Sequence, residues 1–159
     1  VSPLPFNKSS KPEGIGPMSM TIDRIAGTFE MLQDWEERYQ FIYDLGKRLP
    51  ALDDRFKDSD HQVHGCMSQV WFNVQPSAAE PDRLELAGES DTAVIQGIVA
   101  ILVALYSGKT LAEMLAVDAD EVFQRLGIYD HLSPNRHVGV YAMVEKIRSL
   151  AQASAAAAA

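Results

Sequence analysis

The chain is almost free of cysteine: its 159 residues include one, Cys66. A single thiol cannot close an intramolecular disulfide, which excludes a small secreted scaffold built on disulfide bridges. The scarcity of cysteine fits a reducing compartment, and we expect a cytoplasmic protein. Any sulfur chemistry at Cys66 must therefore involve a second molecule.

Clusters of basic residues and long apolar runs are also missing. The net charge is −8, and this excess of acidic residues disfavours attraction to the phosphates of nucleic acids or to anionic membranes. The most apolar stretch, residues 93–106, is interrupted by Gln96 and Gly97 and is shorter than the roughly 20 residues that a membrane-spanning helix needs. We predict no nucleic-acid partner and no membrane, and expect protein partners instead.

Length and composition predict one globular domain with short tails. Apolar residues make up 47% of the chain, which is ordinary for a soluble domain, and a chain of this length buries a core without disulfides. Residues 1–20, rich in proline and glycine and without the apolar segment of a signal peptide, are interpreted as a flexible leader or an expression extension. The domain is expected over residues 21–152, followed by a low-complexity tail over 153–159.

The spacing of apolar residues predicts helices on both sides of a short β region. Thr21 or Asp23 can cap the first helix. A second helix starts near Trp35 and ends before Pro50, because a residue that precedes proline disfavours helical dihedral angles. After the β region, helices are predicted over 92–107, 110–115 and 118–126, and from Pro134 to about Gln152.

Two segments alternate apolar and polar side chains as strands do. Residues 67–74 combine β-branched and aromatic residues, and residues 83–88 alternate again after a connection that contains two prolines. We expect these strands to pair antiparallel, and the sequence leaves a further edge strand from residues 51–63 open. Strands clustered between helices predict an α+β fold, in which helices pack a small antiparallel sheet.

Cys66 lies where a polar loop becomes the first strand. Gly65 precedes it, and a glycine can adopt dihedral angles closed to other residues while it leaves room beside the sulfur. That arrangement suits a nucleophile that another protein must reach. A free cysteine is also among the most buried residue types, so a small structural side chain is the alternative.

The residues around Cys66 carry a family resemblance. Residues 63–71 read VHGCMSQVW, which resembles the signature of the SufE family of cysteine desulfuration proteins, the CsdE-like proteins included. Further segments resemble the family in the same order: WEERY at 35–39, LGKRLP at 45–50, GESDTAVIQG at 88–97, and LSPNR at 132–136 with Gly139. The likeness covers roughly residues 23–150, and several motifs in register are more specific than any one of them.

The resemblance implies a fold shared with IscU-type scaffolds and the work of a carrier rather than an enzyme. SufE-like proteins take sulfur from the persulfide of a pyridoxal-phosphate cysteine desulfurase of the SufS or CsdA type, which they stimulate. They pass this sulfur to an iron–sulfur cluster scaffold. The family's acceptor cysteine corresponds to Cys66, and the resemblance implies no cofactor or metal held by the chain itself.

Candidate supporting or partner-binding residues accompany Cys66 and Gly65. Asp91 matches an acidic family position near the acceptor loop, with capping of the following helix as its alternative role. Arg136 matches the arginine that opens the family's last helix; it either binds the partner, favours a thiolate or forms a surface salt bridge. His64 lies outside the signature, and a protonated imidazole near Cys66 would lower the pKa of the thiol.

Two positions depart from the family pattern. Met67 and Val138 stand where many SufE-like proteins carry a polar residue. Neither changes the cysteine or the residues that define the signature. Both are candidates for an altered partner preference.

Three other functions use the same residues. His61, His64 and Cys66 carry zinc-ligand chemistry but lack a fourth ligand in their motif. Cys66 with His131 or His137 as base would make a cysteine hydrolase, although neither histidine lies in a recognised motif. A partner-binding module with a structural cysteine is the third alternative. The sequence leaves the oligomeric state open, a homodimer included.

Overall fold

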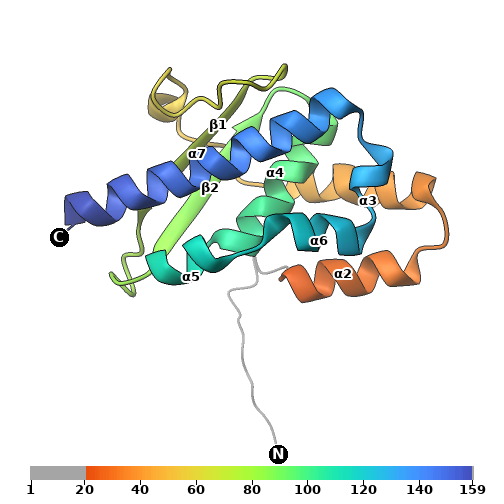
Figure 1. Cartoon of the computed structure of the whole chain (residues 1–159), viewed down its shortest axis with the longest axis horizontal. Coiled ribbons are helices and arrows are strands. Elements are labelled where there is room, and N and C mark those ends of the chain that lie inside the picture. Colours follow the sequence, from red (N-terminus) through yellow and green to blue (C-terminus); the bar gives the residue numbers. More distant parts are fainter. Residues whose placement is uncertain (1–20, 159) are drawn as a thin grey trace, which may run out of the picture.

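The computed structural model describes residues 21–158, so the leader predicted over residues 1–20 lies outside the described part. Helices pack against a two-stranded antiparallel sheet, which confirms the predicted α+β fold (Figure 1). The elements follow the chain in this order: α2 (Ile22–Met31), α3 (Trp35–Arg48), the 3-10 turn η2 (Asp54–Phe56), β1 (Val70–Pro76), β2 (Leu84–Ser90), α4 (Ala93–Tyr106), α5 (Leu111–Ala116), α6 (Ala119–Leu126), the 3-10 turn η3 (Tyr129–His131) and α7 (Pro134–Ala158).

Local side-chain caps fix where the first two helices begin. The hydroxyl of Thr21 accepts a hydrogen bond from the Arg24 N–H at 3.2 Å, so Thr21 rather than Asp23 caps α2. Asp34 caps α3 in the same way, because its carboxylate accepts from the Glu37 N–H at 2.9 Å. These bonds satisfy backbone donors that have no partner inside the helix.

The sheet is a hairpin with one buried face. Val70 pairs with Ser90 at one end of the ladder, and Pro76 pairs with Leu84 at the other. Alternate residues of both strands are buried, as expected for strands that cover a core on one face. The core residues that the two strands supply are Val70, Phe72, Val74, Leu84 and Leu86.

Both strands start and end later than the sequence predicts. Residues 67–69 are not part of β1, and the Gln69 N–H bonds to the side-chain carboxylate of Asp91 instead of to a backbone carbonyl. Segment 51–63, which the sequence left open as an edge strand, contributes one isolated bridge between Gln62 and Trp71. The chain before β1 therefore runs beside the sheet without adding a third strand.

α4 is the apolar stretch, and it is the buried centre of the fold. It packs on β2 and crosses α3, and nearly all of its residues lie in the core. At the crossing, a Cβ on Gly97 would overlap Ile42, so only a glycine permits this approach of the two helices. No helix within residues 21–158 is both long and apolar enough to cross a membrane.

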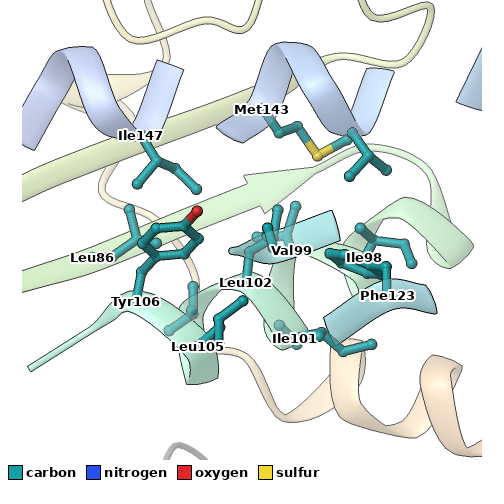
Figure 2. Packing of buried hydrophobic residues seen from close by; sticks show 14 of the residues in the cluster. Leu86, Ile98, Val99, Ile101, Leu102, Leu105, Tyr106, Phe123, Met143 and Ile147 are labelled. Atoms are coloured by element: carbon teal, nitrogen blue, oxygen red, sulfur yellow. The ribbon is translucent and has the colours of Figure 1, made fainter. Parts of the chain in front are cut away.

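α7 covers the buried face of the sheet beside α4. Figure 2 shows Met143 and Ile147 of α7 pointing toward the α4 side chains, Tyr106 among them. The helix runs to Ala158, beyond the end near Gln152 that the sequence predicts. The last residues are almost all alanine, which has the strongest intrinsic helix propensity, and neither glycine nor proline ends the helix there.

The segment that leads to Cys66 is clamped onto the sheet by charge. The ammonium of Lys57 lies 2.8 Å from the carboxylate of Glu89 on β2 and 3.2 Å from that of Asp54. The hydrogen bond with Glu89, followed by that with Asp54, raises the pKa of Lys57. Glu89 also accepts from the Leu52 N–H at 2.9 Å. Two points of this segment are thereby held against β2.

The hydroxyl of Tyr106 is buried in the core without a hydrogen-bond partner among residues 21–158. Desolvation raises the pKa of this phenol from 10.0 to about 12. A polar group that is buried and left unpaired costs roughly 1–3 kcal/mol of stability. Tyr129 is a useful contrast, because its hydroxyl donates to the carboxylate of Asp120 at 2.7 Å.

We expect Tyr106→Phe to raise the free energy of unfolding in urea by about 1 kcal/mol, because it removes the unpaired hydroxyl. Tyr129→Phe is the matched control and should lower the free energy of unfolding by a similar amount, since it breaks the hydrogen bond to Asp120.

The folded-state pKa of Tyr106 lies above the unfolded value of 10.0, so stability should fall as pH rises from there toward about 12. Tyr106→Phe should lose less over that range, and a destabilised Tyr106→Phe protein would contradict this reading.

Candidate functional site

Cys66 lies in a loop, residues 64–69, whose two ends are tied together. The Val63 N–H donates to the Val70 carbonyl at 2.8 Å, and the Phe72 N–H donates to the His61 carbonyl at 3.0 Å. Val63 and Val70 are both buried. The loop therefore projects from a fixed base while its own residues stay outside the ladder.

Gly65 turns this loop. Its φ is +98°, in the region that side-chain-bearing residues rarely adopt. A Cβ at Gly65 would lie 3.7 Å from the Cβ of Ala142 on α7, which is an ordinary contact distance. The constraint at Gly65 is therefore backbone conformation, and this conformation sets the path of the chain into Cys66.

The sulfur of Cys66 rests against α7 at Gly139. A Cβ on Gly139 would lie 3.1 Å from the Cys66 Sγ and 3.7 Å from its Cβ, so the missing side chain makes room for the thiol. Gly139 is buried, and Cys66 is half-buried. Glycine inside a helix costs about 0.5–1 kcal/mol relative to alanine, and here it allows the sulfur to approach the helix backbone.

Asp91 holds the far end of the loop. Its carboxylate accepts from the Gln69 N–H at 3.1 Å, and its own N–H donates to the Gln69 carbonyl at 3.2 Å. The N-cap residue of α4 is Thr92, whose side chain makes no cap hydrogen bond, so the alternative of Asp91 as helix cap is wrong. Asp91 instead fixes Gln69, which follows Cys66 closely in the same loop.

His61 and His64 both bond to residues of the preceding turn. The Nδ1 of His61 lies 2.7 Å from the carboxylate of Asp58, and this hydrogen bond lowers the pKa of Asp58. The Nε2 of His64 lies 3.0 Å from the Ser59 carbonyl. Across residues 21–158, no three His, Cys, Asp or Glu side chains gather closely enough to hold a metal ion, so the zinc alternative finds no geometry there.

His131 and His137 are also engaged away from the thiol. The ring of His131 stacks on Trp35 with centroids 3.7 Å apart. The Nε2 of His137 bonds to the Tyr129 carbonyl. Within the described range, neither histidine forms the oriented pair with Cys66 that a cysteine hydrolase needs.

Arg136 lies one helical turn before Gly139 on α7, at a pocket of about 490 Å³. Lys47 and Tyr43 of α3 line the same pocket, together with Thr92 at the start of α4. Thr92 follows Asp91 in the sequence, and Asp91 is hydrogen-bonded to Gln69 of the Cys66 loop. Two cationic side chains, those of Arg136 and Lys47, thus line one pocket on a protein whose net charge is −8.

The structure places Cys66 and Gly65 in one loop, bonds Asp91 to Gln69 of that loop, and places Arg136 at the pocket that Thr92 also lines. His64 stands on the loop but turns to Ser59. Sequence reasoning did not identify Gly139 as a contact of the sulfur. The available signal was a glycine inside a predicted helix, which often marks a close approach of another segment.

Gly139→Ala should expose the thiol, because the new methyl group occupies the space beside Sγ and pushes the loop outward. We expect iodoacetamide to alkylate Cys66 in the folded protein several-fold faster than in the parent. Gly27→Ala is the matched control: Gly27 also lies in a helix, and nothing lies within 4 Å of its added Cβ. It should leave the alkylation rate unchanged and stabilise the fold by about 0.5–1 kcal/mol. An unaltered rate in Gly139→Ala would refute the contact.

Asp91→Ala should loosen the loop, because the Gln69 N–H loses its side-chain acceptor. We expect faster hydrogen exchange at the Gln69 amide and faster alkylation of Cys66. Asp91→Asn keeps a side-chain oxygen as acceptor and should change both rates less. Equal protection of the Gln69 amide in parent and Asp91→Ala would show that this bond does not hold the loop.

Comparison with known proteins agrees with the motifs around Cys66. The sequence model of SufE, described as an Fe–S metabolism associated domain, matches residues 23–151. An uncharacterized SufE-like protein of Rhizobium etli is 38% identical over 148 residues, which cover 92% of this chain and 99% of the relative. A second uncharacterized SufE-like protein, from Rhizobium meliloti, is 38% identical over 133 residues, covering 83% and 95%.

A solved structure shares the fold. The solution structure of a hypothetical protein from Thermus thermophilus superposes with a TM-score of 0.69 over 89% of this chain and 98% of its own. Its sequence is 14% identical, so this likeness concerns the fold alone. The match of the family over nearly the whole domain, with relatives at 38% identity, shows that the chain belongs to the SufE family of Fe–S metabolism.

Proposed function

We propose that this protein is a sulfur acceptor for a pyridoxal-phosphate cysteine desulfurase of the SufS or CsdA type. It takes the persulfide sulfur onto Cys66, stimulates the desulfurase and passes the sulfur to an iron–sulfur cluster scaffold. The observation that supports this most is the position of the lone thiol. Cys66 lies half-buried on a loop that is tied at both ends but belongs to no strand.

The transfer is a thiol–disulfide type of exchange. The Cys66 thiolate attacks the outer sulfur of the donor persulfide, a new S–S bond forms on Cys66, and the S–S bond of the donor breaks. The electron pair of that bond leaves with the donor cysteine as its thiolate. One S–S bond replaces another, so the step needs no external oxidant or reductant.

A lone cysteine suits a carrier. With no second thiol in the chain, a persulfide on Cys66 cannot be discharged by an intramolecular disulfide. The sulfur leaves only when an outside nucleophile removes it. A cytoplasmic location, where thiols stay reduced, would keep Cys66 free for the next cycle. The carbon–sulfur cleavage belongs to the partner, so the chain itself needs no cofactor and acts as an activator and carrier.

Arg136 is the proposed partner-binding side chain beside Cys66. It is exposed at the pocket that it shares with Lys47, and no ion pair of its guanidinium is found within residues 21–158. A carboxylate of a docking protein would find two cations there. Charge complementarity of this kind mainly raises the rate of encounter and fixes the orientation of the complex.

The proposal is tested by mixing the protein with a cysteine desulfurase and cysteine and measuring its intact mass. The parent should gain increments of about 32 Da, one per sulfur atom, which reductant removes. Cys66→Ser should gain none and should stimulate the desulfurase less. Absence of the adduct on a parent whose thiol is accessible to alkylation would reject sulfur transfer. Full stimulation by Cys66→Ser would favour a binding module with a structural cysteine.

A further inference from the structure

Two of the large apolar side chains that the protein exposes adjoin the thiol. Met67 is 85% exposed and follows Cys66 in the loop. Val138 is 57% exposed and precedes Gly139 on α7. The Cys66 Sγ lies against Gly139. Met67 and Val138 come from different elements, and each is next in sequence to a residue of this contact.

Their placement differs from that of ordinary exposed apolar residues. Single apolar side chains are scattered over most protein surfaces and need no explanation. Met67 and Val138 instead lie beside the residues that hold the single thiol of the chain, on segments brought together by the contact of Cys66 with Gly139.

We propose that Met67 and Val138 form an apolar rim around Cys66 that selects the sulfur donor. The inference rests on the proposed sulfur transfer. The occupant is the segment of the desulfurase that bears the donor cysteine, with an apolar side chain beside that cysteine. Met67 and Val138 are specificity-determining residues on this account, because they read the neighbourhood of the donor sulfur rather than react with it.

The chemistry of transfer places the donor on the rim. An S–S bond of about 2.05 Å must form on Sγ, so the donor sulfur has to approach the flanks of Cys66. A donor segment in that position covers Met67 and Val138 and removes their apolar surface from water, which favours association. A polar or charged group at the same place would be buried without a partner, which disfavours a donor of that kind.

A donor segment seated on the rim would also shield the sulfur from water. Apolar side chains on both flanks of Cys66 exclude water once the donor segment is seated. A shielded site limits side reactions of a reactive intermediate, here the loss of persulfide sulfur to small thiols. The rim therefore combines selection of the donor with protection of the sulfur while it passes from the donor to Cys66.

The test compares Met67→Gln with Val138→Thr, singly and together, in assays with SufS-type and CsdA-type desulfurases. The rate of persulfide formation on Cys66 is measured against acceptor concentration. We expect the double variant to lose roughly ten- to hundredfold in kcat/KM with the desulfurase that serves the parent best, mainly through a higher KM. Sulfur uptake from inorganic polysulfide and alkylation by iodoacetamide should stay at parental rates, because the thiol itself is untouched.

Met31→Gln is the matched control. Met31 is 78% exposed, a fraction similar to that of Met67. It lies on α2, which Figure 1 shows at the opposite edge of the molecule from α7. It should leave all rates unchanged. A double variant with the parental kcat/KM would overturn the rim and leave sulfur transfer standing. The same conclusion would follow if the double variant lost as much rate with polysulfide as with the desulfurase. A parent that takes sulfur from polysulfide but from neither desulfurase would overturn both proposals.

Discussion

The contact between the Cys66 sulfur and the backbone of α7 at Gly139 is the constraint on which the site depends. The loop could project freely from its base between Val63 and Val70, yet the thiol lies back against the helix. The room for it exists because Gly139 has no side chain. The core supports that arrangement, since Val140 and Met143 of the same helix are buried under the sheet and fix the position of α7.

The ties around the loop differ in strength, and that difference is consistent with the proposed transfer of sulfur at Cys66. The backbone bonds at Val63 and Val70 are buried and hard to break. The bond of Gln69 to Asp91 is exposed, and the seat at Gly139 is a van der Waals contact. On the proposed function, a docking protein would displace the thiol from its seat while the base of the loop keeps its place. Segments of low local stability are where proteins commonly place moving functional groups.

Features that are local in sequence were predictable, whereas contacts between distant segments were not. The α+β fold, the apolar core helix and the Cys66 loop with Gly65 follow from periodicity, turn chemistry and the motif. The bond of Asp91 to Gln69 joins residues 22 positions apart, and the helix-cap role suggested by its position was wrong. The contact of Cys66 with Gly139 depends on how α7 packs on β1. α7 runs past its expected end because alanine continues a helix that nothing stops.

The central claim is that Cys66 carries sulfur from one protein to another, and a chase experiment tests it most directly. The protein is loaded with radioactive sulfur by a desulfurase, separated from that enzyme and mixed with an apo iron–sulfur scaffold. The account predicts that the label leaves Cys66 and appears on the scaffold without the desulfurase being added back. Label that stays on the chain, or moves only when the desulfurase returns, would contradict the role of this thiol as a carrier.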